Sequence, residues 1–432
     1  MTNPSTTSEN TDSTHTPTFR EAAAYWIKLG FISFGGPAGQ IAMMQTECVD
    51  KRRWIGQGAF LRGLNYAMML PGPEAQQLAA YIGWRLHGVK GAVFAGTMFV
   101  LPGMVLMIAL AWIAAKFGDQ GAVAAVLDGI KPVVVAIVIA AVYRIGSKTC
   151  KGSVALALAI AAFAALQFGD VPFPVVVLGA GLIGILVAKV MPNALAHGHG
   201  PDNAAEVMGQ TAPGSGLGNF IKTSLIFAAL WAGPSALMVA LFGTQPFLDV
   251  INLFTTAAFV TFGGAYAVLP YVADAGVNTY GWLSGAEMID GLALAETTPG
   301  PLILVTVYVG FFAGWSTGGG LMGVLTALVT AYVTFLPSLY LIIAGAPYVE
   351  SIQRFAWARN ALSAITAAVV GVILSLGIFL GRAAFVDTGG GIAWIDVTAA
   401  AVALALLISG RVSIPLMVAL GALFGLARFF IF

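Results

Sequence analysis

Long stretches of this sequence contain no charged residue. A membrane-spanning helix needs about 20 consecutive apolar residues, and most of these stretches approach or exceed that length. Only 9% of all residues are charged, whereas a soluble domain has about 25%. The sequence therefore predicts an all-α polytopic membrane protein and excludes a soluble enzyme, a nucleic-acid-binding protein and a disordered scaffold. The uncharged stretches are 91–115, 152–169, 171–188, 223–248, 250–273, 297–349 (long enough for two elements), 360–381 and 412–427.

The chain also repeats itself. Phe31-Ile-Ser-Phe-Gly-Gly36 matches Phe259-Val-Thr-Phe-Gly-Gly264, a shift of 259 − 31 = 228 positions. Trp54 matches Trp282, and Pro71-Gly-Pro73 matches Pro299-Gly-Pro301, at the same shift. Ungapped matches at one shift indicate two homologous repeats.

The repeats define the expected domain organisation. Residues 1–17 form a polar, disordered tail, 18–191 the first repeat and 246–432 the second repeat. The linker 192–245 carries one extra transmembrane helix at 220–243. If each repeat crosses the membrane an even number of times, this extra helix inverts the second repeat.

Charge supports the inversion. The loop after the first Gly-Gly pair carries Lys51, Arg52, Arg53 and Arg62, whereas the matching loop 267–290 has no Lys or Arg. Short cytoplasmic loops carry an excess of Lys and Arg. We therefore expect an inverted repeat with discontinuous or re-entrant helices, about 9 to 13 membrane segments and a cytoplasmic N-terminus.

Glycine and proline interrupt each repeat twice, at the Gly-Gly and Pro-Gly-Pro positions. Gly costs about 1 kcal/mol and Pro about 3 kcal/mol in a helix interior, so these positions predict helix breaks. A helix that restarts after a break exposes unpaired N–H groups and a partial positive charge, which suit an anion. Close helix packing through small residues, or a simple kink, is the alternative interpretation.

Few ionisable residues lie near the breaks. Glu74 and Glu296 are candidates for proton coupling. A carboxyl group at membrane depth costs free energy, so its presence there indicates a function. Lys28 precedes the first break and is a candidate charge partner for an anionic substrate, although it could equally extend to the membrane interface.

Other chemistry finds no support in the sequence. Cys48 and Cys150 are too few for a disulfide framework or a cysteine-based metal site, and His197 and His199 make a weak metal signal in a linker. The sequence has no Walker A motif, paired catalytic carboxylates or nucleophile elbow. We expect no catalytic residue, no metal, no cofactor and no enzymatic activity.

The sequence resembles the chromate ion transporter family in its long-chain, two-domain form. The residues that carry the resemblance are 34–44 (FGGPAGQIAMM), 65–77 (NYAMMLPGPEAQQ), 81–88 (YIGWRLHG), 99–103 (FVLPG), 261–271 (TFGGAYAVLPY) and 291–302 (GLALAETTPGPL). Many family members have His where this chain has Gln40. The resemblance implies export of chromate from the cytoplasm across the inner (plasma) membrane, which gives chromate resistance.

Chromate is a tetrahedral oxyanion, and two facing helix N-termini suit it without a buried Arg pair. We expect a site near the midplane between the repeats, where backbone N–H groups bind the anion and Gln and Thr side chains tune it. The predicted substrate-binding residues are Gly35, Gly36, Pro71, Gly72, Pro73, Gln76, Gln77, Gly263, Gly264, Thr298, Pro299 and Gly300.

Three other functions compete with chromate export. They are a transporter or antiporter of sulfate or another oxyanion that chromate mimics, a passive anion channel, and a membrane chromate reductase. The expected partners are chromate, with sulfate as the alternative, and the lipid bilayer, with the protein as a monomer or homodimer. No nucleic acid is expected.

Overall fold

The structure, a computed structural model, describes residues 15–191, 216–348, 356–386 and 390–431. Most of the predicted tail 1–17, much of the linker 192–245, and both His197 and His199 lie outside these residues. All secondary-structure elements of the described residues are helical, apart from one isolated bridge between Val386 and Ile392.

Eight helical segments make up the part of the chain that precedes the linker. They are α1 (Phe19–Ile32), α2 (Gly36–Met44), the wide π-helical turn η1 (Gln45–Lys51), α3 (Gln57–Met69), α4 (Glu74–Phe117), α5 (Gly121–Thr149), α6 (Ser153–Phe168) and α7 (Phe173–Val190).

The remaining elements follow the linker. They are α8 (Leu217–Phe242), α9 (Phe247–Val260), α10 (Ala265–Asp274), η3 (Ala275–Thr279), α11 (Gly285–Thr297), the 3-10 turn η4 (Leu302–Leu304), α12 (Val305–Gly345), η5 (Ala346–Tyr348), α14 (Ala356–Phe385), α15 (Trp394–Ile408) and α16 (Ile414–Ile431).

The lengths and compositions of these helices confirm a multi-pass, all-α membrane protein. Seven helical stretches are long and apolar enough to cross a bilayer, and three shorter apolar helices (153–168, 247–260 and 394–408) accompany them. The extra helix of the linker is present as α8, and its side chains are largely exposed apart from Ser235.

The repeat in the sequence is also a repeat in the backbone. Helix α1 maps onto α9, and α3 onto α11, with both ends of each pair shifted by 247 − 19 = 285 − 57 = 228 residues. The glycines of the breaks recur with positive φ in both halves, at 91° and 71° for Gly35 and Gly36 and at 80° and 98° for Gly263 and Gly264. All four predicted breaks are therefore real interruptions of the helices.

Each half also contains one further break that the motifs do not reveal. Helix α4 bends at His87 and Gly88, and α12 bends at Gly318 and Gly319, with closely similar backbone angles. The bend in α12 confirms that the uncharged stretch 297–349 holds two elements.

The last three helices of each half exchange partners. Helix α5 of the first half packs on α15 and α16 of the second, while α14 of the second packs on α6 and α7 of the first. Helices α5 and α14 also pack on each other, as do α4 and α12. The two halves therefore pack on each other through equivalent helices.

Glycines permit the closest of these contacts. A Cβ atom on Gly129 of α5 would lie 2.3 Å from the Gly421 carbonyl oxygen of α16, and one on Gly371 of α14 would lie 1.9 Å from the Ala159 carbonyl oxygen of α6. Small residues let helix backbones approach in a membrane, where packing rather than the hydrophobic effect drives association.

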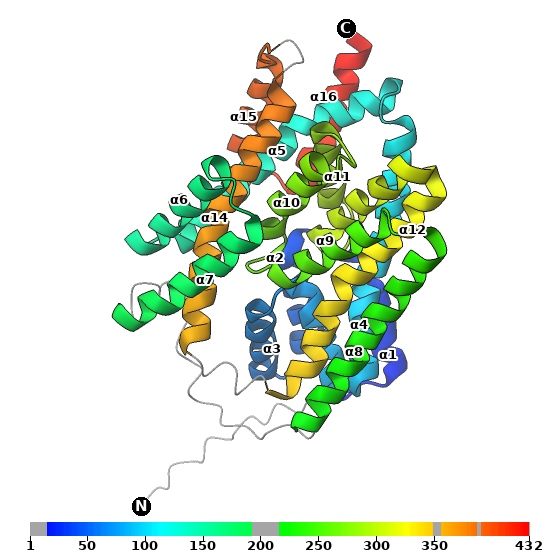
Figure 1. The fold of residues 1–432 in the computed structure, drawn as a ribbon, viewed down its shortest axis with the longest axis vertical. Helices are drawn as coiled ribbons and strands as arrows, with labels where there is room; N and C mark the ends of the chain where they lie inside the picture. The colour runs from blue at the N-terminus through cyan, green and yellow to red at the C-terminus, as the bar shows by residue number, and fades with distance from the viewer. Residues whose placement is uncertain (1–14, 192–215, 349–355, 387–389, 432) are drawn as a thin grey trace, which may run out of the picture.

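Figure 1 shows α3 towards the lower end of the molecule and α11 towards the upper end.

Candidate functional site

The four helix breaks are tied together across the two halves by a reciprocal pair of backbone hydrogen bonds. The Gly72 N–H donates to the Thr261 carbonyl over 2.8 Å, and the Gly300 N–H donates to the Ser33 carbonyl over 3.1 Å. Gly72 matches Gly300 and Ser33 matches Thr261 in the repeat, so each Pro-Gly-Pro segment bonds the Gly-Gly break of the other half. The structure thus brings the predicted break segments together in two equivalent pairs.

Glycine is required at both donor positions. Gly72 and Gly300 have φ of 118° and 102°, a region that side-chain-bearing residues rarely adopt. A Cβ on Gly72 would lie 2.4 Å from Ser338 Oγ, and one on Gly300 would lie 2.9 Å from Leu304 Cδ1. Both glycines are buried, as are Pro73 after Gly72 and Pro299 before Gly300. Pro71 is half-buried.

Gln40 donates hydrogen bonds to two of the break segments. Its Nε2 donates to the Ser33 carbonyl over 2.8 Å and to the Gly300 carbonyl over 2.7 Å, and the residue is fully buried. Gln40 therefore ties the first Gly-Gly break to the second Pro-Gly-Pro segment. Sequence reasoning did not include it among the binding residues, although an amide within the apolar α2 was the available signal.

Gln76 and Gln77 lie in the first turn of α4 and are buried. The Gln77 Nε2 donates to the Pro71 carbonyl over 2.7 Å, and the Gln76 Nε2 reaches the Gly96 carbonyl over 3.5 Å. Their Oε1 atoms are buried without a hydrogen-bond partner. In this conformation the two amides hold the backbone with their donors, and Thr298 Oγ1 likewise donates to the Ala295 carbonyl.

The N-termini of α2 and α10 differ in what faces them. Neither helix has a side-chain cap, and a Cβ atom on Gly35 or Gly36 at the start of α2 would meet open space. At the start of α10, a Cβ on Gly264 would lie 3.4 Å from a carboxyl oxygen of Glu74. A carboxyl oxygen of Glu74 therefore lies near the start of α10, where the helix carries a partial positive charge, whereas the side-chain positions of Gly35 and Gly36 at the start of α2 are open.

The other ionisable candidates lie on either side of these breaks. Glu296, near the end of α11, accepts a short hydrogen bond from the Tyr266 hydroxyl in the first turn of α10. Lys28 is exposed on α1, a little more than one turn before the first break. No hydrogen bond or ion pair joins Lys28 to another side chain within the described part of the chain.

The two equivalent loops carry different charges. Lys51 and Arg52 donate to the Glu47 carboxylate over 2.8 and 3.1 Å, and these bonds hold the pKa of Glu47 below its usual range. The matching turn η3 has instead a hydrogen bond from Asn278 to Asp274 over 2.8 Å. The contrast in charge expected from the sequence is thus built into folded loops of equivalent shape.

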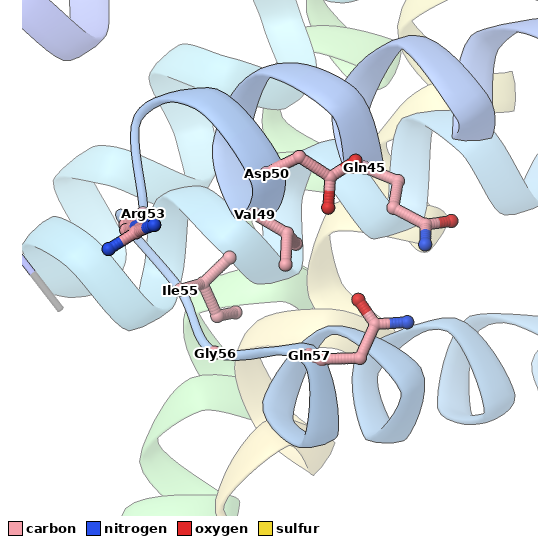
Figure 2. Close-up of a pocket in the computed structure, with 7 residues that line it drawn as sticks. All are labelled: Gln45, Val49, Asp50, Arg53, Ile55, Gly56 and Gln57. Carbon is pink, nitrogen blue, oxygen red and sulfur yellow. The ribbon is translucent and has the colours of Figure 1, made fainter. Parts of the chain in front are cut away.

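Two cavities lie away from the breaks. Figure 2 shows one of about 510 Å³ between η1 and α3, lined by Gln45, Val49, Asp50, Arg53, Ile55, Gly56 and Gln57. Asp50 and Arg53 bring opposite charges to it, so it offers an anion no net attraction. The other, about 610 Å³, is an apolar groove among α5, α15 and α16. None of the predicted binding residues lines either cavity.

Comparisons with known proteins identify the family of this chain. The family model described as chromate transporter matches residues 20–185 and 248–426. The chain is 32% identical to a chromate transport protein of Pseudomonas aeruginosa over 356 residues, covering 81% of this chain and 78% of that protein. It is 28% identical to a chromate transport protein of Cupriavidus metallidurans over 420 residues, covering 96% and 94%.

A probable chromate transport protein of Synechococcus elongatus is 28% identical over 373 residues, covering 85% of this chain and 86% of that protein. No solved structure matches the chain. The family model covers more than half of the sequence and falls on both repeats. The chain belongs to the chromate transporter family.

Proposed function

We propose that this protein is a secondary transporter that exports chromate across the inner membrane, with the oxyanion bound where the four helix breaks meet. The observation that carries the proposal is the reciprocal pair of bonds, Gly72 to Thr261 and Gly300 to Ser33. Each bond joins a Pro-Gly-Pro segment to the Gly-Gly break of the other half, next to the uncapped start of α2 or of α10. No Arg or Lys is buried among the described residues, so the proposed site relies on these helix starts.

The α2 N-terminus is the primary contact in this conformation. Gly35 is exposed, Gly36 is half-buried, and both have open space on the side where a side chain would project. The unpaired N–H groups of a first helical turn and its partial positive charge bind a tetrahedral oxyanion well. The prolines at positions 71, 73 and 299 keep the adjoining backbone out of helical conformation.

The α10 N-terminus is the second contact, and Glu74 controls it. A carboxylate beside Gly264 competes with an oxyanion for the same partial charge. Neutralisation of Glu74 by a proton removes this competitor, so Glu74 links anion binding to the proton. Glu296 is a second proton-coupling candidate through its bond with Tyr266, and Lys28 attracts the anion towards the first break from its exposed position.

Gln76, Gln77 and Thr298 adjust the site. Their donors bond backbone carbonyls in this conformation, and rotation of either amide exchanges its oxygen for its NH2 group. Gly263 and Pro299 shape the backbone of the second half around the same centre.

The transport cycle follows from the two-fold relation of the halves. Inverted repeats with broken helices at the midplane are the architecture of many secondary transporters, in which one repeat moves against the other. The exchanged packing of α5 and α14 and the opposite positions of α3 and α11 in Figure 1 support an inverted arrangement. The Lys and Arg residues of the first loop favour a cytoplasmic N-terminus.

A charge placed at the start of α2 tests the site. Gly36→Asp puts a carboxylate into the open space beside the helix N-terminus, and Gly36→Asn is the uncharged control of nearly equal size. Asn and Asp both tolerate positive φ, so the backbone strain is matched. We expect uptake of radiolabelled chromate by everted membrane vesicles to be abolished in Gly36→Asp and largely kept in Gly36→Asn. Equal losses in both variants would place the site elsewhere.

The same vesicles separate the rival functions. Uphill chromate accumulation under an imposed gradient excludes a passive channel. Strong inhibition of chromate uptake by sulfate, with uptake of labelled sulfate at a comparable rate, favours a general oxyanion transporter. Direction is read from the sidedness of the vesicles.

Topology is tested by labelling single cysteines in a chain that carries Cys48→Ser and Cys150→Ser. Arg52→Cys and Glu287→Cys occupy the two equivalent loop regions. An inverted repeat predicts that an impermeant reagent labels them from opposite sides of the membrane. Labelling from the same side contradicts the inversion.

A further inference from the structure

Among the described residues, two buried polar groups without a hydrogen-bond partner lie on α11 and α12, which pack on each other. Asp290 is 6% exposed and Tyr308 is fully buried, and both Asp290 Oδ1 and the Tyr308 hydroxyl lack a partner among the described residues. The Tyr308 ring packs on Gly291, where a Cβ atom would lie 2.5 Å from the ring. The phenol therefore lies against the residue that follows Asp290.

A lysine from the other half of the molecule faces this pair. Lys131 is on α5, which packs on α11. Its Nζ bonds Asp128 Oδ1 over 2.6 Å, and the Asp128 side chain is 65% exposed. Lys131 also acts electrostatically on Asp290, although no ion pair joins the two residues in the described structure.

The remaining groups that face Asp290 are acidic or phenolic. Asp128 and Asp119 face it from α5 and the turn before that helix, Glu287 from its own helix one turn earlier, and Tyr308 from α12. Helices α4, α14 and α16 also pack on α11. Among the charged groups, Lys131 has the largest electrostatic effect on Asp290.

Burial decides the charge that Asp290 can carry in this arrangement. Burial without a hydrogen bond on Oδ1 penalises the ionised carboxylate. The conformation with Lys131 on Asp128 therefore favours the neutral acid at Asp290. Asp128 is largely exposed and its pairing with Lys131 is weak, so an ionised Asp290 would draw Lys131 away from Asp128.

We propose that Asp290 is a proton-binding site whose occupancy decides which carboxylate Lys131 pairs with. The protonated acid leaves Lys131 on Asp128. When the O–H bond breaks, the proton passes to water on the side of Glu287, the electron pair stays on Asp290, and the Lys131 ammonium moves to it without changing its own charge.

Through this exchange of partners, the contact between the two repeats depends on whether Asp290 is protonated. Lys131 belongs to the first repeat and Asp290 to the second, so each state of the acid sets a different α5–α11 contact. Helix α11 ends at Thr297 and leads directly into the break at Thr298–Gly300. The inference rests on the proposed function in that the break is the proposed oxyanion site, and it supplies a proton-driven step for that site.

Infrared difference spectroscopy of the purified full-length protein in lipid nanodiscs tests the proposal without chromate. A pH titration follows the carbonyl band of a neutral carboxylic acid. Glu74 and Glu296 are also proton-binding candidates, so we expect several titrating components, of which Asp290→Asn removes one. Asp396→Asn is the control, because Asp396 pairs with Arg428 near the surface over 3.2 Å, and it should leave all components unchanged. A titration in which Asp290→Asn removes no component overturns the proposal.

Two partly exposed substitutions test the exchange even where Asp290→Asn folds poorly. Lys131→Met removes the counter-charge and should move the midpoint of the band to higher pH. Asp128→Asn frees Lys131 and should move the midpoint to lower pH. We expect each of the two shifts to be about half a pH unit or more, where one unit corresponds to 1.36 kcal/mol. Unchanged midpoints, or shifts in the same direction, overturn the exchange.

Vesicle transport then separates this inference from the proposed function. If Asp290 drives the cycle, Asp290→Asn abolishes the dependence of chromate flux on a proton gradient while chromate binding persists. A titrating Asp290 in a protein that moves no chromate contradicts the proposed function alone. Proton-dependent chromate flux with no titration at Asp290 contradicts this inference alone.

Discussion

The two repeats share a backbone but differ in the groups that surround their breaks. Gly35 and Gly36 in the first repeat start a helix that faces open space, whereas Gly264 in the second faces the Glu74 carboxyl group. The position equivalent to Glu74 is Leu302, and the position equivalent to Glu296 is Met68. The first repeat therefore offers an uncovered helix N-terminus, and the second is surrounded by carboxyl groups.

This difference assigns distinct tasks to two halves of one shape. Duplication supplies the reciprocal bonds of Gly72 and Gly300, which need both halves equally. The acidic groups Glu74, Asp290 and Glu296 all lie near or on elements of the second break, and none has an acidic counterpart in the other repeat. In our proposal the symmetric backbone holds the anion and the asymmetric side chains handle the proton.

The largest expected effect comes from the residues in which the repeats agree most closely. Gly72→Ala and Gly300→Ala each force a Cβ into a backbone with positive φ and a close neighbour, at a cost of about 2–4 kcal/mol. We expect both variants to lose chromate transport and to unfold at clearly lower temperature in detergent. Gly281→Ala is the control, because its φ is 62° but a Cβ there meets open space. A harmless change at one glycine only would break the equivalence of the repeats.

Gln40 tests a brace that only the first repeat has, since Val268 is at the equivalent position. Gln40→Leu removes the amide that donates to the Ser33 and Gly300 carbonyls. The Ser33 carbonyl keeps its bond from the Gly300 N–H, but the Gly300 carbonyl loses its buried side-chain donor, at about 1–3 kcal/mol. We expect lower thermal stability and reduced chromate uptake. Gln120→Leu, at an exposed amide, should change neither property. Full activity of Gln40→Leu would mean that the backbone bonds alone hold the break.

Glu74→Gln removes the carboxyl group that lies near the start of α10. This group makes the surroundings of the α10 N-terminus differ from those of the α2 N-terminus. The α10 N-terminus then faces a neutral amide, and we expect chromate to bind several-fold more tightly, in line with about 0.3–1 kcal/mol for a charge at a helix end. The pH dependence of uptake should weaken at the same time. Leu302→Glu places the same group at the equivalent position and should weaken chromate binding. Unchanged affinity in both variants would separate Glu74 from the anion site.

The smallest effect concerns the loops. Bonds from Lys51 and Arg52 lower the pKa of Glu47, so the pair stabilises the folded state above the unfolded pKa of Glu47. This contribution disappears as the pH falls through the lowered folded pKa. Since both cations are largely exposed, Glu47→Gln should cost at most about 0.5 kcal/mol at neutral pH, with no loss at acid pH. Thermal unfolding at two pH values measures it, and Asp274→Asn in the matching loop is the comparison.

The sequence predicted the breaks, the extra helix and the membrane class because glycine, proline and the absence of charge act locally. It did not predict the bends at His87-Gly88 and Gly318-Gly319, because these positions do not match each other at the shift of 228 and so form no repeated motif. The bonds of Gln40 and the exchange of α5 and α14 escaped prediction because they join residues far apart in sequence. Asp290 was visible only as part of an acidic loop, since its burial depends on α5 and α12. The domain boundaries, the binding residues and the inversion remain predictions.

The exchanged packing of α5 also bears on how the protein is made. The ribosome completes α5 long before α15 and α16, and α16 covers residues such as Gly129 and Val133 in the finished molecule. Until the last helices enter the membrane, that face of α5 contacts lipid or a membrane-insertion factor. A chain that stops after α12 leaves the first half unfinished as well as the second. We therefore expect assembly to occur late, after synthesis is almost complete, and C-terminal truncations to be degraded as whole molecules.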